Sequence, residues 1–332
     1  MKTYASAFSF VAAYCLAFCA NTFAEETSAP CSVEWTGRRV VFLGDSITND
    51  GTYIAHLETA LRIADPDAEV DFINLGLSSE TVSGLSEPAH AFPRPDLHER
   101  LDRVLEKAEP KLVVACYGIN DAIYYPFSKQ RFTAYNDGVK RLIKKCDEAK
   151  VKLVLLTPLP FDPLPGKKAG TLLPAGEKEY SWKNIYKNYD EVMQKYAAWL
   201  VELREPTVTD QAKLVACVID LHTPVNNFLQ EKRQELPDYS LSKDGVHINS
   251  DGHQLMAQII ARATGIEPRG VSPRVAERKA EIYELVKQRQ DLLHDAWLSH
   301  VGHKRPGVKP GLDLKIANNM ADNLLKMIKL VQ

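Results

Sequence analysis

The chain has 332 residues, its formal net charge at pH 7 is −2, and 45% of its residues are hydrophobic. A nearly neutral chain lacks the basic face that a nucleic-acid partner would require, so the composition argues against nucleic-acid binding. The length allows one large hydrophobic core, or such a core with an appended segment.

The first 24 residues have the pattern of a secretory signal peptide. Lys2 supplies a positive charge, Phe8–Ala20 form an apolar stretch, and an imperfect cleavage site precedes Glu25. We therefore expect residues 1–24 to be removed and the protein to be exported, to the periplasm or the extracellular space. A weak lipobox ending at Cys19 leaves lipoprotein anchoring as a minor alternative. No remaining apolar run is long enough for an integral membrane segment.

Apolar runs alternate with helical patterns through the middle of the chain. The runs expected to form strands are Arg39–Leu43, Val70–Leu75, Lys111–Tyr117, Val151–Leu156 and Leu214–Ile219. The expected helices are Gly51–Ala64, Asp96–Ala108, Phe132–Ala149, Asn184–Leu203 and Asp251–Thr264. Strands that alternate with helices form a parallel sheet covered on both faces, and right-handed crossovers leave few topologies. We predict an α/β fold, a three-layer α/β/α sandwich whose five-stranded parallel sheet has the flavodoxin-like order 2-1-3-4-5.

Polar segments follow several of these runs. Gly44-Asp45-Ser46 ends the first run, Gly76 lies just after the second, Asn120-Asp121 follow the third, and Asp244-Gly245-Val246-His247 lie near the end of the sheet region. Each segment alone has an ordinary explanation as a turn or a helix cap. Ligands of open parallel sheets bind outside the carboxyl ends of the strands, so their joint occurrence indicates one site there.

The residue types at these positions suit nucleophilic catalysis. The Ser46 hydroxyl is a weak nucleophile until a base accepts its proton, and His247 can be that base because the pKa of histidine lies near physiological pH. Asp244 can accept the other ring N–H and stabilise the imidazolium. Attack on an ester creates an oxyanion, which the backbone N–H groups of Ser46 and Gly76 and the side-chain amide of Asn120 can hold.

On these residues the chain resembles the SGNH, or GDSL-type, family of serine esterases and lipases. Gly44-Asp45-Ser46-Ile47 matches the first block of the family, with Ile where Leu is usual, and Gly76 fits the second block. Gly118-x-Asn120-Asp121 matches the third block and Asp244-x-x-His247 the fifth. The resemblance covers residues 36–266. It implies a five-stranded α/β/α sandwich, no cofactor, and ester hydrolysis through an acyl-enzyme.

The sequence lacks two motifs that are typical of other hydrolases and of metal sites. The chain has no Gly-x-Ser-x-Gly elbow, which argues against an ordinary α/β-hydrolase. It also has no Cys/His spacing typical of zinc, so we expect no metal site.

Two other histidines compete with His247 for the role of base. His222 follows the fifth run and His253 begins the last helix, but only His247 has an aspartate three residues before it, as the family pattern requires. Asp45, Tyr124 and His222 are our candidates for substrate contacts.

The substrate is less closely specified. The long segments Leu77–Pro95 and Phe161–Ser181, with the aromatic Tyr124-Tyr125-Pro126-Phe127, are expected to wall a cleft over Ser46. Aromatic faces suit sugars, and export with a nearly neutral charge favours an acetylated carbohydrate. A lipase-, lysophospholipase- or thioesterase-like hydrolase and a non-catalytic glycan-binding module stay as alternatives. The oligomeric state is left open.

Four cysteines follow the signal peptide. Cys116 and Cys217 fall on the third and fifth runs, so one strand would separate them by roughly 9–10 Å. A disulfide needs Cα atoms within about 7 Å, and we expect both residues to be buried free thiols. Cys31 and Cys146 could pair, but no feature of the sequence places them together.

Residues 270–332 form an expected helical extension of the sheet domain. Apolar residues recur there at helical spacing, first Ile282, Leu285, Val286, Leu293, Ala296 and Trp297, and then Ile316, Met320, Leu324, Met327 and Val331. Two amphipathic helices must bury these faces, against the sheet domain or in a dimer. The connector Trp297–Gly307 is either a solvated loop or brings His300, His303 or Arg305 to the Ser46 cleft, where such a group can bind hydroxyls or an acidic sugar.

Overall fold

The computed structural model describes residues 31, 33–204, 215–266, 275 and 277–332. The expected signal peptide and Cys19 lie outside this part of the chain. Within it, no helix is long and apolar enough to span a lipid bilayer.

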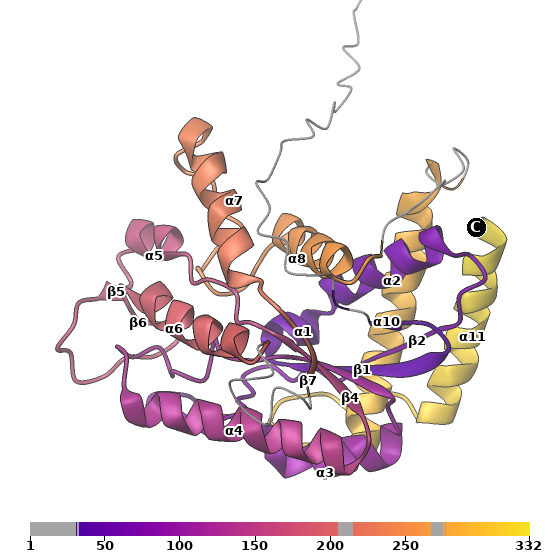
Figure 1. Cartoon of the computed structure of the whole chain (residues 1–332), viewed down its shortest axis with the longest axis horizontal. Coiled ribbons are helices and arrows are strands. Elements are labelled where there is room, and N and C mark those ends of the chain that lie inside the picture. Colours follow the sequence, from indigo (N-terminus) through magenta and orange to yellow (C-terminus); the bar gives the residue numbers. More distant parts are fainter. Residues whose placement is uncertain (1–30, 32, 205–214, 267–274, 276) are drawn as a thin grey trace, which may run out of the picture.

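A five-stranded parallel sheet forms the centre of the fold (Figure 1). Its strands stand in the order β2 (Val70–Asn74), β1 (Arg38–Gly44), β3 (Leu112–Cys116), β4 (Lys152–Leu156) and β7 (Val215–Ile219). This order confirms the predicted 2-1-3-4-5 topology, with β7 as the fifth strand. The chain leaves β1 toward β2 and returns to β3 on the other side, so the carboxyl end of β1 opens the crevice where such sheets bind ligands.

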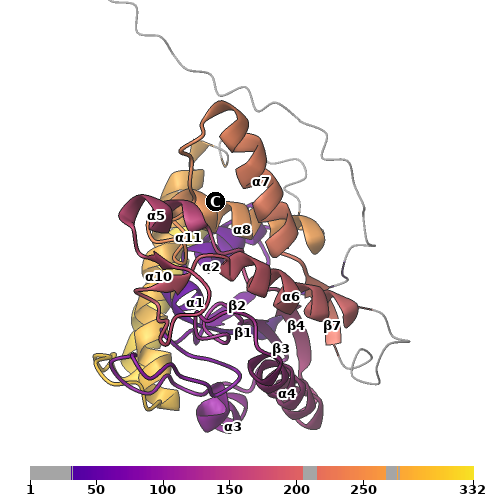
Figure 2. The ribbon, with the colours of Figure 1, turned by 90° about the vertical axis from the view of Figure 1, so that its left-hand side faces the viewer.

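Helices cover both faces of the sheet, as the sequence predicted. α2 (Thr52–Ala64) and α8 (Ser250–Ala263) lie on one side, and α3 (Leu97–Ala108) and α4 (Lys129–Glu148) lie on the other (Figures 1 and 2). The two views together show the three layers of the predicted sandwich.

Some elements were not expected from the sequence. α7 (His222–Glu235) begins soon after β7 and buries few apolar residues, so its periodicity is weak. α5 (Pro163–Ala169) occupies the second long loop. The short strand β5 (Leu172–Leu173) pairs with β6 (Ile185–Tyr186), and α6 (Tyr189–Glu202) therefore starts later than predicted.

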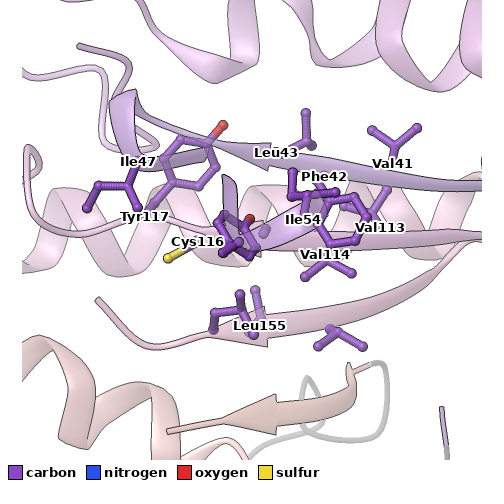
Figure 3. Packing of buried hydrophobic residues seen from close by; sticks show 14 of the residues in the cluster. Val41, Phe42, Leu43, Ile47, Ile54, Val113, Val114, Cys116, Tyr117 and Leu155 are labelled. Atoms are coloured by element: carbon purple, nitrogen blue, oxygen red, sulfur yellow. The ribbon is translucent and has the colours of Figure 1, made fainter. Parts of the chain in front are cut away.

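The strands are mostly apolar because the sheet is covered on both faces, with polar residues chiefly near the strand ends. The four residues Val40–Val41–Phe42–Leu43 of β1 are completely buried. Phe42 packs edge-on against Phe72 of β2, with ring centroids 5.0 Å apart. Figure 3 shows Val113 of β3 and Leu155 of β4 in the same core. This packing gives the loops at the carboxyl ends of the strands a rigid base.

The disulfide of the described chain corrects one prediction. Cys217 is bonded to Cys31, with Cα atoms 5.7 Å apart, whereas Cys116 and Cys146 are buried free thiols. The expectation for Cys116 is confirmed, but that for Cys217 is wrong. It considered only the strands beside Cys217. Cys31 precedes β1 and lies against the end of α8, where its N–H donates to the Ala263 carbonyl at 2.9 Å, so a segment outside the sheet supplies the partner of Cys217.

The first helix of the C-terminal extension packs on the sheet domain. α10 (Lys279–Val301) contacts α2 and β2, and it stands at the β2 side of the sheet in Figure 1. Its predicted apolar face is buried. Gln290 donates Nε2 to the Phe72 carbonyl oxygen at 3.3 Å and to the carboxylate of Glu58. Glu58 is completely buried and also accepts two hydrogen bonds from Arg62, at 2.8 and 2.7 Å.

The second helix of the extension corrects another prediction. α11 (Leu314–Val331) packs against α10, but Ile316, Met320 and Met327 are 53%, 48% and 50% exposed. Its buried residues are Ala317, Ala321, Ile328 and Val331. Ala317 and Ala321 belong to the buried face, and a pattern that counts only long apolar side chains overlooks them. The predicted face is therefore only partly correct: Val331 is buried and Leu324 packs against the same small cluster, whereas the other three predicted residues are exposed.

Candidate active site

The chain turns sharply at the end of β1. Asp45 caps α1 (Ser46–Asp50) by accepting the Ile47 N–H at 3.0 Å. A Cβ on Gly44 would lie 2.8 Å from the Cys116 carbonyl oxygen of β3, so glycine is required there. Ser46 is thus the first residue of the helix, and its N–H has no partner within the helix.

A chain of hydrogen bonds joins Ser46 to two residues of the loop before α8. Ser46 Oγ lies 2.9 Å from His247 Nε2, and His247 Nδ1 lies 2.7 Å from Asp244 Oδ2. Asp244 Oδ1 accepts the backbone N–H groups of Val246 and His247 at 2.9 and 2.8 Å. With Asp244 ionised, Nδ1–H donates to the carboxylate, which leaves Nε2 to accept the serine proton.

The charges along this series of hydrogen bonds favour proton acceptance by His247. The hydrogen bond to Asp244, together with its negative charge, raises the pKa of His247 against the opposing effect of burial. Burial opposes ionisation of Asp244, but hydrogen bonds from the His247 side chain and backbone outweigh it and hold the pKa of that carboxyl well below its usual range. Asp244 is therefore a carboxylate wherever His247 can work as a base.

Asn120 presents its amide from the loop after β3. Its Oδ1 accepts the Tyr124 hydroxyl at 2.7 Å, and its Nδ2 donates to the Glu80 carbonyl at 3.3 Å. Glu80 is itself held by a buried ion pair with Arg100 at 2.6 Å. These contacts orient the amide so that its nitrogen has one further N–H for a ligand.

Gly76 does not occupy the place predicted for it. Its N–H donates to Asn74 Oδ1 at 2.9 Å, and the residue is buried away from the cavity around Ser46. A Cβ on Gly76 would lie 2.3 Å from the Asn49 backbone nitrogen, so packing explains the glycine. From the same loop, Ser79 lines the cavity with a positive φ of 72°. No hydrogen bond from its N–H to another described residue is formed.

A cavity of about 320 Å³ opens in front of Ser46 and His247. The first long loop walls it as predicted, and Trp182, just beyond the second long loop, contributes an indole that is 44% exposed. The other lining residues are Ser78, Ser79, His90, Ala91, Phe92, Arg94, Asn120, Tyr124 and Arg305. The lining is mixed, with aromatic faces and several hydrogen-bond donors.

Of the predicted substrate contacts, only Tyr124 lines this cavity. Asp45 is buried as the cap of α1, and desolvation raises its pKa to about 6. His222 is buried and lies 3.1 Å from Asp190, away from the cavity. His253 is also remote and contacts Asp50 at 3.3 Å.

The connector between the C-terminal helices reaches the cavity, and this confirms one of the two predicted placements. Arg305 lines the cavity and donates Nε to the Ser78 carbonyl at 2.7 Å. His303 lies in a neighbouring cavity, and the His300 carbonyl accepts a hydrogen bond from Lys107. Arg94 belongs to the first long loop, which was expected to wall the cleft, but no pattern in that loop singles it out. Trp182 lies one residue beyond the second long loop and was not predicted.

Within the described part of the chain, no group of three or more His, Cys, Asp or Glu residues is arranged to hold a metal ion.

A serine, a histidine and an aspartate joined in this order define a class of hydrolases that attack acyl groups with a serine hydroxyl. Residues 42–255 match the model of the GDSL-like Lipase/Acylhydrolase family. The chain belongs to this family and is a carboxylic ester hydrolase. No curated protein sequence matches it.

Solved structures share the fold. Axe2, an acetylxylan esterase from Geobacillus stearothermophilus, is 20% identical with a TM-score of 0.50, and the match covers 74% of this chain and all (100%) of that one. BT4096, a gut microbial diltiazem-metabolizing enzyme, is 21% identical with a TM-score of 0.54. That match covers 70% of this chain but 48% of the enzyme, so the chain spans about half of its length.

Proposed function

We propose that the protein is an exported serine esterase that removes a short acyl group, acetyl, from a carbohydrate through an acyl-enzyme. The observation that carries this proposal is the hydrogen-bonded chain from Ser46 through His247 to Asp244, which ends at an open cavity. The residues of the oxyanion site and the identity of the substrate are part of the same proposal.

The proposed reaction begins with the Ser46 hydroxyl. His247 Nε2 removes its proton as Oγ attacks the ester carbonyl, and Asp244 stabilises the imidazolium that forms. His247 then gives the proton to the departing sugar oxygen, which leaves the acyl group on Ser46. Water, which gives a proton to His247, then attacks the acyl group. The bond to Oγ breaks, His247 returns the proton to Oγ, and the carboxylic acid is released.

The negative charge on the carbonyl oxygen needs donors that are already in place. Asn120 Nδ2 and the Ser46 N–H at the start of α1 are two of them. We assign the third to the Ser79 N–H, in place of Gly76, because the Gly76 N–H is bonded to Asn74 while Ser79 lines the cavity.

The size and lining of the cavity favour a short acyl group on a sugar. Its volume of about 320 Å³ is at the lower end of the range for ligand sites, roughly 300–1,000 Å³. The exposed Trp182 ring offers a flat apolar face to a sugar, and the neutral or cationic donors around it suit hydroxyls. The likeness to an acetylxylan esterase agrees with this proposal at the level of the fold.

Export is supported by two features. Residues 1–24 have a signal-peptide pattern, and the Cys31–Cys217 disulfide suits an oxidising compartment.

A panel of esters tests the substrate class. The protein is expected to hydrolyse p-nitrophenyl acetate faster than longer-chain p-nitrophenyl esters, and to release acetate from an acetylated polysaccharide. A preference for long acyl chains with no acetate released would favour the lipase-like alternative. A folded protein that a fluorophosphonate probe fails to label would favour the non-catalytic glycan-binding module.

The pH dependence tests the coupling of His247 to Asp244. Only neutral His247 accepts a proton, so kcat/KM should rise with pH through the pKa of His247, which is raised above the ordinary histidine value. Asp244→Asn removes the charge that raises this pKa. The rising limb should therefore move to lower pH while the plateau falls, as measured with a small neutral ester. A limb that stays in place would assign the titration to another group.

A further inference from the structure

Arg305 places a positive charge at the cavity without an acidic partner. Among the described residues, no carboxylate lies within ion-pair distance of it, and burial alone lowers its pKa. Arg94 in the same cavity is different, because both carboxylate oxygens of Glu87 accept from it, at 2.6 and 2.7 Å. Arg305 thus carries the uncompensated guanidinium of this lining.

The Arg305 side chain is held in place but keeps donors to spare. Nε donates to the Ser78 carbonyl at 2.7 Å and Nη1 to the Pro306 carbonyl at 3.1 Å. The guanidinium carbon also lies 5.2 Å from the ring centroid of Phe92. Of the five N–H donors of a guanidinium, these bonds use two and leave three without an acceptor among the described residues.

The surroundings decide from which side an anion would approach. Arg305 also lines a neighbouring cavity of about 400 Å³, where Asp50, Asp291 and Asp295 would repel an anion. The lining of the Ser46 cavity contains no aspartate or glutamate. An anion that binds Arg305 is therefore drawn to the side of the nucleophile.

We propose that Arg305 binds a carboxylate of the substrate, so that the natural substrate is an acetylated polysaccharide containing uronic acid. This inference rests on the proposed function and names its substrate class. A guanidinium offers a planar pair of donors that matches a carboxylate. Arg305 lies beyond the residues 42–255 that match the family, so the C-terminal extension supplies this subsite to the GDSL-like domain.

Paired substrates and paired variants test the subsite. Acetate release is measured from acetylated polygalacturonate, which is acidic, and from acetylated xylan, which is neutral. The wild type should favour the acidic polymer in kcat/KM. Arg305→Gln should reduce this preference about 10- to 100-fold, chiefly through KM, since a hydrogen bond to a charged group is worth ~1.5–3 kcal/mol. Lys304→Gln, which removes a neighbouring exposed charge, should leave the preference unchanged.

A second readout is independent of the polymers. Galacturonate should inhibit p-nitrophenyl acetate hydrolysis by the wild type more strongly than galactose does, and Arg305→Gln should remove the difference. Thermal unfolding establishes that both variants are folded. If Arg305→Gln lowers kcat/KM equally on both polymers, Arg305 only holds the Ser78 loop in place, and the proposal is overturned.

The outcomes separate the subsite from the proposed function. Inhibition by galactose 6-sulfate without inhibition by galacturonate would overturn the assignment to a carboxylate. If the enzyme hydrolyses small esters but releases acetate from neither polymer, the proposed function fails. The galacturonate comparison then still decides whether Arg305 binds a carboxylate.

Discussion

Ser46→Ala is expected to lower the turnover of p-nitrophenyl acetate by about 10⁴–10⁶. The substitution removes the oxygen that His247 contacts at 2.9 Å, and neither His247 nor Asp244 can replace it as the attacking group. A serine that is first in its helix does not cap it, because Asp45 does, so the fold should survive. Turnover and thermal unfolding are measured on the same preparation.

The matched control is Ser250→Ala, which changes an exposed serine at the start of α8. It should keep wild-type turnover. Comparable turnover by Ser46→Ala and the wild type would refute the serine mechanism as a whole. Covalent labelling by a fluorophosphonate gives the same answer without a substrate, because Ser46→Ala should lose the label and Ser250→Ala should keep it.

Asn120→Ala is expected to lower kcat by roughly 10²–10³, with a much smaller change in KM. The amide is oriented by the Tyr124 hydroxyl at 2.7 Å and by the Glu80 carbonyl at 3.3 Å, so its remaining N–H is in position before the oxyanion forms. Steady-state kinetics on a small ester separate kcat from KM.

Tyr124→Phe is a milder variant that tests how the Asn120 amide is oriented. It leaves the Asn120 amide present but removes one of the contacts that orient it, so kcat should fall less than in Asn120→Ala. If kcat is unchanged in Asn120→Ala, Asn120 does not stabilise the oxyanion and only forms part of the turn.

The features that the sequence predicted correctly are those that depend on a local pattern of residues. Buried parallel strands require continuous apolar runs, and a run such as Val40–Val41–Phe42–Leu43 is visible without any partner. The residues Ser46, Asp244 and His247 follow from chemistry and spacing, and the structure brings them within hydrogen-bonding distance. Their catalytic roles stay predictions until the variants are measured.

The errors concern features that depend on packing between distant segments. Gly76 is predicted as an oxyanion donor, but its N–H is bonded to Asn74 and the Asn49 backbone packs against it. Ser79 has a positive φ that its side chain does not reveal. Cys217 bonds Cys31, which is 186 residues away in a segment before β1, and the spacing between strands does not describe that segment.

The placement of Arg305 was predicted only in part from the sequence. The sequence gives His300, His303 and Arg305 of the connector as candidates. Which of these side chains enters the cavity depends on how α10 packs on the sheet domain. The same docking places the apolar residues of α10 in the core.

The contact between Gln290 and Phe72 has a consequence for solubility. An outermost strand presents unpaired backbone groups that can recruit a strand from another chain. In β2 the carbonyl oxygens of Val70 and Phe72 accept from Arg62 and Gln290, at 3.3 Å in both cases, and are thereby occupied. A chain cut after Thr264 would lose Gln290 and uncover this strand, so its aggregation would report an unprotected sheet and not a missing substrate subsite. Single substitutions in the connector keep the two roles of the extension apart.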